Sequence, residues 1–330
     1  MKKIELVLET CLIFLCLISC SKDLPNRNLT PIKSIERLSD STYLSDVVSN
    51  MVYYNNTLFF SDCSNSRIVN LDSNYRVIRI YGSPGRGPGE FLTPDQFAIV
   101  KDSLYVFDHS TKKILIFDMI GKFSREFNLN RYPEVYSRLA ISKFGKIYVS
   151  TPLLDYPITV FDRNGNILYG IGSKCNNKLA FYKKMASISH LLIYKDSFLL
   201  SVRASSAEID VYDLEGLYIK KIDLSNLDIV KDLLKFFNET KRQDGIPSIF
   251  TDVSLYDDKL FLKTASANDG TYNSNIIIEC KLNQLDIKPV TSFTITSKGG
   301  GTGMLLYFGA KSKEIIGFNQ STQSLDIFQF

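Results

Sequence analysis

The chain has 330 residues, of which 45% are hydrophobic and 22% charged. This composition supplies a large core and excludes both a multi-span membrane protein and a disordered chain. The net charge is +4, whereas nucleic-acid-binding proteins usually carry a stronger or more clustered basic excess, so we expect no nucleic-acid partner. The chain has only two histidines, which argues against histidine-rich metal sites, and the sequence indicates no metal and no other cofactor.

Residues 1–19 have the pattern of a secretory signal peptide. Two lysines precede an apolar stretch that ends in CLIFLCLI (11–18) and is too short for a membrane span, which needs about 20 apolar residues. The stretch ends in Leu17-Ile18-Ser19-Cys20, which resembles a bacterial lipobox, the signal for acylation of the cysteine by fatty acids such as palmitate. An uncleaved anchor, or a plain signal peptide with a chance cysteine, is the alternative.

The segment 20–31 is polar and contains two prolines, which predicts a flexible tether lipidated at Cys20. Lys22 and Asp23 resemble the short surface-export signal of Bacteroidetes lipoproteins. We therefore expect a lipid-anchored protein of the cell envelope, with the outer membrane favoured and its side left open. Three cysteines remain, at positions 63, 175 and 280; their wide spacing predicts free thiols, with one accidental pair left open.

A short strand pattern recurs six times in the remainder of the chain. The copies are LFFSD (58–62), LYVFD (104–108), IYVST (147–151), FLLSV (198–202), LFLKT (260–264) and IIGFN (315–319). A second pattern follows each copy: IVNLD, ILIFD, ITVFD, IDVYD, IIIEC and LDIFQ. These runs are rich in β-branched and aromatic residues, as strands are. Tight-turn residues such as Asn55-Asn56 and Asn164-Gly165 separate the runs.

Each unit is thus predicted to hold four antiparallel strands in roughly 45 residues, the period of a propeller blade. Six units predict an all-β fold, a six-bladed β-propeller spanning residues 32–330. Segment 81–127, with its Gly-rich turn and paired strands that end in Asp, resembles an NHL-type repeat. The whole chain resembles the six-bladed propeller lipoproteins of Bacteroidetes. That resemblance implies the fold and leaves the ligand open.

The last unit has only three strands before the chain ends at Phe330. A propeller that does not close leaves exposed strand edges. We predict that segment 32–38 (IKSIERL) pairs with the final strand and closes the ring; a loose N-terminal strand is the alternative. One helix is expected in the blade connection 225–252, with Leu227, Val230, Leu234 and Phe237 on one side and Ser225 near its start. Three roles are open for this predicted helix: it caps the central channel, it docks a partner, or it packs on the neighbouring blades.

The predicted loops differ in length between the two faces of the ring. Loops between strands one and two and between three and four are short, whereas blade connections and the remaining loops are long and varied, and scaffolds place function on such loops. Tolerated insertions are the alternative explanation. Basic and tyrosine residues on the long loops form a candidate binding rim: Arg86, Arg131, Tyr132, Tyr156, Tyr182, Lys183, Lys184, Arg203, Lys241 and Arg242. The alternative is that these residues form an ordinary solvated surface without a partner.

Other motifs do not support catalysis. The glycines of YGSPGRGPGEF (81–91) lack the Lys-Ser/Thr of a phosphate loop and are interpreted as turn glycines. Asp62 and Asp108 end equivalent strands, but the matching positions in the other blades give a poor calcium cage. His109 and His190 lack zinc-site spacing. We therefore expect no catalytic residues and a binding or interaction module for an envelope protein or glycan. A propeller enzyme of lactonase or lyase type is the alternative, and a scaffold without a small-molecule site is a third.

Overall fold

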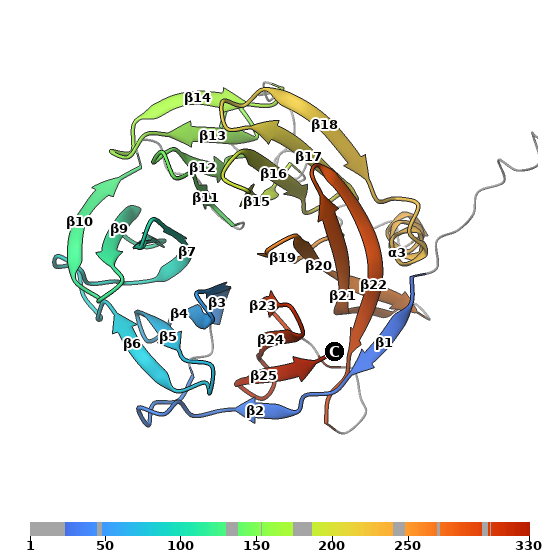
Figure 1. Ribbon diagram of the computed structural model, residues 1–330, viewed down its shortest axis with the longest axis horizontal. Coiled ribbons are helices and arrows are strands. Elements are labelled where there is room, and N and C mark those ends of the chain that lie inside the picture. Colours follow the sequence, from blue (N-terminus) through green and yellow to red (C-terminus); the bar gives the residue numbers. More distant parts are fainter. Residues whose placement is uncertain are drawn as a thin grey trace, which may run out of the picture.

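The computed structural model describes residues 24–44, 48–129, 138–152, 154–173, 187–239, 248–268, 271–298, 303 and 305–330. Six antiparallel sheets stand around a central axis, so the fold is the predicted six-bladed β-propeller (Figure 1). From the axis outward, the first three blades are β3 (Val48–Tyr54), β4 (Thr57–Asp62), β5 (Arg67–Leu71), β6 (Val77–Tyr81); β7 (Pro94–Val100), β8 (Ser103–Asp108), β9 (Lys113–Asp118), β10 (Phe123–Asn128); and β11 (Ala140–Ile141), β12 (Ile147–Ser150), β13 (Ile158–Phe161), β14 (Ile167–Ile171).

Blades 4 to 6 follow the same order and include the longest strands of the protein, in blade 5. They are β15 (Ser189–Tyr194), β16 (Phe198–Arg203), β17 (Glu208–Asp213), β18 (Tyr218–Asp223); β19 (Asp252–Tyr256), β20 (Lys259–Asn268), β21 (Thr271–Asn283), β22 (Asp286–Ile295); and β23 (Phe308–Lys311), β24 (Glu314–Asn319), β25 (Ser324–Gln329). The recurring sequence patterns are the second and third strands of each blade. These strands are almost wholly buried, as in β5 and β24, whereas outer strands such as β6 alternate half-buried and exposed residues before a buried Tyr81.

The short turns have the backbone that their residues favour. Asn55 and Asn56 have φ angles of 48° and 58°, and Lys101 and Asp102 have 48° and 56°. Two successive residues with positive φ form a type I′ turn, whose twist matches that of the strands it connects. Asparagine and aspartate tolerate this region better than most residues. The predicted turns thus fix the register of the first hairpin in these blades.

The N-terminal segment closes the ring, as predicted. Strand β2 (Lys33–Ile35) pairs antiparallel with β25 and completes blade 6, and the Ile32 amide donates to the Ile327 carbonyl at 2.8 Å. A second strand was not predicted: β1 (Asn26–Leu29) pairs in parallel with β22 as a fifth strand of blade 5. It lies in the range 20–31, where the sequence predicts only a flexible tether. The segment therefore runs along the outer edges of the last two blades (Figure 1), and we name residues 24–44 the strap.

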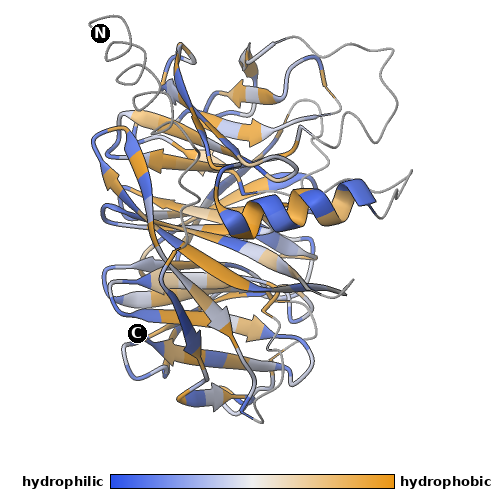
Figure 2. Ribbon diagram, turned by 90° about the vertical axis from the view of Figure 1, so that its right-hand side faces the viewer, coloured by the Kyte–Doolittle hydropathy of each residue, from blue (hydrophilic) through white to orange (hydrophobic). Residues whose placement is uncertain are grey.

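Helix α3 (Asp228–Glu239) lies in the connection from blade 4 to blade 5, as predicted. Val230 and Leu233 are fully buried against blades 4 and 5. Figure 2 shows its polar face turned outward. Packing on the blades explains the helix, and it does not cap the axis, because it lies outside the ring in Figure 1. Ser225 stands three residues before the first helical residue, so the helix begins later than predicted.

No helix among the described residues is long and apolar enough to cross a membrane. Cys63 and Cys280 are free and buried, as expected, while Cys175 lies outside the described residues.

Candidate functional site

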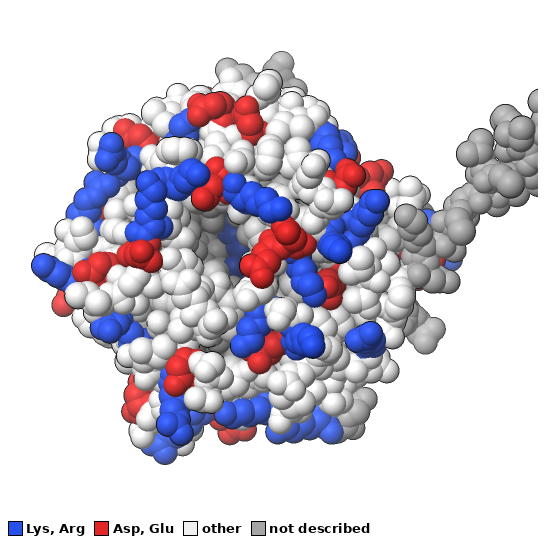
Figure 3. Space-filling model, viewed as in Figure 1, with Lys and Arg blue, Asp and Glu red and all other residues white. Residues whose placement is uncertain are grey.

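The face with the short turns uses its polar groups to join neighbouring blades. Lys143 of blade 3 contacts Asp196 of blade 4 at 3.6 Å, and Lys195 of blade 4 contacts Asp258 of blade 5 at 2.8 Å. The remaining boundaries are bridged in the same way, by Tyr54 to Asp102, Arg125 to the Arg163 carbonyl, Lys259 to the Ser312 carbonyl and Tyr53 to Glu314. Figure 3 shows this face, where Lys and Arg alternate with Asp and Glu around a central hollow.

Each of these exposed contacts contributes little to stability, on the order of 0–1 kcal/mol. Their distribution is more informative than their strength. The ion pairs of Lys143 and Lys195 therefore balance part of the charge on this face across blade boundaries.

A buried polar cluster crosses the axis near the other face. The Arg138 guanidinium, just before β11, binds the Asp252 carboxylate of β19 through Nε at 2.8 Å and Nη2 at 3.0 Å. It also donates to Asn50 Oδ1 of β3. The Phe308 amide of β23 donates to Asp252 at 3.0 Å. We call Asn50, Arg138, His190, Asp252 and Lys263 the axial cluster.

Local backbone geometry aims one member of the cluster at the axis. Asn50 has a φ of 40° at a bulge in β3, between Ser49 and Met51. A bulge adds one residue to a strand and redirects its side chain. The Asn50 Nδ2 donates to the Phe97 carbonyl of blade 2 at 2.8 Å, so the amide joins blades 1 and 2 to Arg138. The cluster thereby connects the innermost strands of five blades.

Burial shifts the pKa values of the two other bases in the cluster. His190 is 5% exposed, and burial lowers its pKa to about 4, so the ring is neutral near pH 7. Its Nε2 lies 3.2 Å from the Phe250 carbonyl, which makes Nε2 the protonated nitrogen. Nδ1 has no partner in the described part of the chain. Burial also lowers the pKa of Lys263 to about 8, partly offset by Asp252, and its ammonium donates to Thr251 and to the Leu306 carbonyl.

Next to the cluster, the channel holds a cavity of about 200 Å³. Arg138 and Asn50 line it together with mostly apolar residues of the innermost strands, among them Met51, Leu139 and Val253. The axial cluster satisfies most of its own charges and hydrogen bonds, so it joins the blades and narrows the channel.

The carboxylates considered for calcium are bound by the protein itself. Asp62 is fully buried and accepts from Arg67 Nε at 2.8 Å and from Asn65. Asp108, also fully buried, accepts from the backbone amides of Leu92 at 2.7 Å and Ser110 at 3.0 Å. Among the described residues, no three His, Cys, Asp or Glu side chains gather as metal ligands would.

The glycine-rich segment 81–91 forms turns, as interpreted from the sequence. Gly82 has a φ of 74° and Gly89 one of 78°. The Gly87 amide donates to the Glu90 carboxylate at 2.7 Å, which leaves this backbone donor occupied rather than open to a phosphate.

Three members of the predicted binding rim lie in the described structure. Arg86 is exposed, and Tyr156 packs on Gly170, where an added Cβ would come within 2.1 Å of the tyrosine ring. Arg203 binds Asp210 at 2.7 Å and Glu208 at 3.2 Å, so its charge is balanced. The other members lie outside the described residues: Arg131, Tyr132, Tyr182, Lys183, Lys184, Lys241 and Arg242.

Arg203 also lines a groove of about 660 Å³ between blades 3 and 4. Asp210, Tyr212 and Lys221 line it as well, and Lys221 pairs with Glu208 at 2.6 Å. The groove has charges of both signs, and those of Arg203, Asp210 and Lys221 are engaged in ion pairs.

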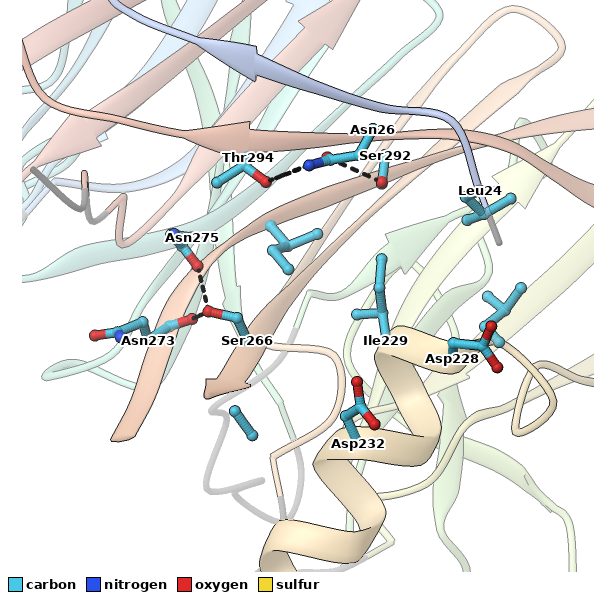
Figure 4. Close-up of a pocket in the computed structure, with 13 residues that line it drawn as sticks. Leu24, Asn26, Asp228, Ile229, Asp232, Ser266, Asn273, Asn275, Ser292 and Thr294 are labelled. Carbon is cyan, nitrogen blue, oxygen red and sulfur yellow. Dashed lines mark hydrogen bonds between the residues drawn. The ribbon is translucent and has the colours of Figure 1, made fainter. Parts of the chain in front are cut away.

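A second cavity, of about 390 Å³, lies between helix α3, the hairpin β20–β21 and the strap, and we call it the α3 pocket (Figure 4). Its polar lining consists of amides, hydroxyls and two carboxylates: Asn26, Asp228, Asp232, Ser266, Asn273, Asn275, Ser292 and Thr294. Leu24, Leu227, Ile229, Ala267 and Ile276 complete it. None of the described residues that line this pocket is a lysine or an arginine.

Hydrogen bonds hold part of this lining in place. Asn26 Nδ2 donates to Thr294 Oγ1 at 3.0 Å, and Ser292 Oγ donates to Asn26 Oδ1 at 3.1 Å. Ser266 Oγ donates to Asn275 Oδ1 at 3.0 Å. Sequence reasoning missed the pocket because its residues come from four separate segments, in the strap, helix α3, the β20–β21 hairpin and β22. The only available signal was the hydroxyl- and amide-rich stretch 264–275 in blade 5.

Comparisons with known proteins agree with the fold. A family model described as a 6-bladed beta-propeller matches residues 39–150, which hold blades 1 and 2 and the first half of blade 3. No curated protein has a sequence that matches this chain significantly.

Many solved structures are similar to it, and three of them illustrate the likeness. A Bacteroides fragilis protein inferred to be exported is 15% identical, covers 91% of this chain and 85% of its own, and gives a TM-score of 0.56. A duf4221 family member from Bacteroides vulgatus is 12% identical, covers 92% and 97%, and also gives 0.56. A streptogramin B lyase is 13% identical, covers 90% and 87%, and gives 0.51. At these identities the likeness shows the fold alone.

Proposed function

We propose that the protein is a lipid-anchored binding module of the cell envelope, which holds a protein or a glycan on its long-loop side and does not bind nucleic acid. The contrast between the two faces carries this proposal. On the short-turn face, polar side chains form hydrogen bonds and ion pairs between neighbouring blades. On the other side, the connection between blades 4 and 5 carries helix α3 and the α3 pocket. The likeness to a Bacteroides protein inferred to be exported supports the envelope location.

Lipidation at Cys20 would keep the domain near the membrane. Five residues separate Cys20 from β1, and an extended chain spans at most about 3.6 Å per residue. The outer edges of blades 5 and 6 would then lie closest to the membrane. In the Cys20→Ala variant we expect loss of labelled palmitate and release of the protein from membranes. A variant that still incorporates palmitate contradicts the anchor.

Binding is tested with the purified full chain on arrays of bacterial and plant polysaccharides and by crosslinking in whole cells. Exchange of Lys183, Lys184, Lys241 and Arg242 for Glu tests the predicted rim. The matched control reverses four exposed charges on the short-turn face, at Lys101, Lys122, Arg163 and Lys313. We expect the first variant to lose binding, more strongly at low salt because exposed charges are screened within about 10 Å at 0.1 M. Equal retention by both variants would contradict a charged rim.

The alternative, a lactonase- or lyase-type enzyme, has less support. Asp62 and Asp108 are fully bound by protein donors, and the axial ion pair engages Arg138 and Asp252. Hydrolysis of simple lactones by the purified chain, abolished by Arg138→Leu at a temperature where that variant is folded, would favour the enzyme.

A further inference from the structure

We propose that the α3 pocket binds an uncharged carbohydrate of one or two sugar units, such as the end of a glycan. This inference rests on the proposed binding function and names the ligand class that one site would take.

The first argument is the hydrogen-bonding capacity that remains in the pocket. Asn275 is only 8% exposed, and its Oδ1 accepts from Ser266, yet its Nδ2 has no acceptor among the described residues. An amide nitrogen carries two N–H donors, so Asn275 can donate to a ligand in the pocket. Asn26 Oδ1 already accepts from Ser292 and Thr294, whereas its Nδ2 donates one bond, to Thr294, and keeps a second N–H. These N–H groups suit a ligand that accepts hydrogen bonds, as sugar hydroxyls do.

The second argument is charge. Asp228 pairs with Lys231 at 3.0 Å, whereas Asp232 has no ion-pair partner among the described residues. Figure 4 shows Asp232 projecting from α3 at the edge of the pocket. A carboxylate acceptor and an amide donor can together hold adjacent hydroxyls. Because the described lining residues include two carboxylates and no lysine or arginine, an anionic ligand is disfavoured.

The third argument is shape and apolar surface. A volume of about 390 Å³ lies near the lower end of the roughly 300–1,000 Å³ of small-molecule sites, which suits a mono- or disaccharide. Phe236, one helical turn after Asp232, stacks on Tyr272 with an interplanar angle of 25°, and Tyr272 directly precedes the lining residue Asn273. Neither ring is among the residues that line the pocket, where Leu24, Ile229 and Ala267 supply apolar surface for the C–H faces of a sugar ring.

The test is calorimetric titration of the full chain, purified in a detergent without a sugar headgroup. The ligands are glucose, galactose, mannose, maltose, cellobiose, lactose and chitobiose, with digalacturonic acid and calcium chloride as charged comparisons. We expect at least one neutral sugar to bind and digalacturonic acid not to bind. Asn275→Leu should weaken that binding at least tenfold and Asp232→Ala severalfold. Glu239→Ala, on the same helix outside the pocket, and Asn74→Ala, in a turn of blade 1, are the matched controls.

Three results overturn the proposal: no binding of any neutral sugar, sugar binding that Asp232→Ala and Asn275→Leu leave unchanged, and binding of calcium alone that depends on Asp232. If Asn275→Leu does not fold, Asp232→Ala decides, because its side chain is exposed and outside the core. The proposed function fails separately. If the rim variant loses binding on the polysaccharide array while the pocket variants keep it, the proposed binding function stands and the sugar site in the α3 pocket is rejected.

Discussion

Two polar regions of this protein differ in burial and in how far their side chains bind one another. In the axial cluster, Arg138, Asn50 and Asp252 bind one another and the Phe308 backbone. In the α3 pocket, Asn275 Nδ2 and the Asp232 carboxylate have no side-chain partner among the residues that the structure describes. The cluster connects five blades around the axis, and the pocket lies at the outer edge of blade 5 beside an inserted helix. The comparison teaches that the buried polar groups at the axis mostly bind one another, with His190 Nδ1 as an exception among the described residues, whereas exposed side chains of the pocket such as Asp232 remain accessible to a ligand.

The largest loss of stability is expected from removal of the strap. It would show how much of the stability of the ring comes from the strap on the outer edges of blades 5 and 6, compared with the axial cluster. Deletion of residues 21–40 removes both β1 and β2 and two buried leucines, Leu29 and Leu38. With about 1 kcal/mol per net hydrogen bond and 1.5–3 kcal/mol per buried leucine, we expect the domain to lose more than about 5 kcal/mol. Thermal unfolding should shift by at least about 10 °C, at roughly 2–4 °C per kcal/mol. Deletion of residues 21–23 alone is the control, and an unchanged melting temperature in the longer deletion would contradict closure.

Substitution of Arg138 tests the axis directly. Arg138→Leu leaves the Asp252 carboxylate buried without its cation, which we expect to lower the free energy of unfolding by about 3–5 kcal/mol in denaturant titrations. The double variant Arg138→Leu, Asp252→Leu removes both charges and should recover a large part of that loss. If the single variant is as stable as the natural chain, the cluster does not hold the blades together.

The pH dependence of stability tests the contribution of His190, a buried member of the axial cluster. Its pKa is about 4 in the folded protein because of burial, against about 6.5 in the unfolded chain, so the unfolded state takes up a proton first as pH falls. The stability from a neutral His190 is complete above pH 6.5 and is lost as pH falls to 4, a change of about 3 kcal/mol. We expect His190→Leu to flatten the curve of unfolding free energy against pH between 4 and 6.5. His109→Gln is the control, and equal slopes in the two variants would refute this.

The smallest effect on stability is expected in the α3 pocket. Asp232 is exposed and has no ion-pair partner among the described residues, so Asp232→Ala should change the free energy of unfolding by less than about 0.5 kcal/mol. Glu239→Ala, with its weak contact to Lys235 at 3.9 Å, should behave alike. Calorimetric melting of both variants checks this. A large loss in Asp232→Ala alone would mean that the pocket, like the axial cluster, is a structural element.

The sequence determined the repeating parts of this protein by itself. Strands with β-branched and aromatic residues, and turns such as Asn55-Asn56, are local features, and they predicted the six blades. The three-stranded last unit required a closing strand, because an open edge is unfavourable, and residues 33–35 supply it. Helix α3 was likewise visible in the spacing of Val230, Leu234 and their neighbours.

Only the tertiary structure decided which polar residues meet. Arg138 and Asp252 are 114 residues apart in the sequence, and Asn26 and Thr294 are 268 apart, so no local pattern links them. Arg203 was expected to offer a positive charge to a partner, yet β17 places Asp210 beside it. Strand β1 was hidden for a similar reason: its residues NRNL have little strand propensity, and they form a strand because the exposed edge of β22 supplies hydrogen-bond partners. Strand and turn propensities depend on a few neighbouring residues and can therefore be predicted from the sequence. The pairing of distant side chains depends on how the blades close around the axis.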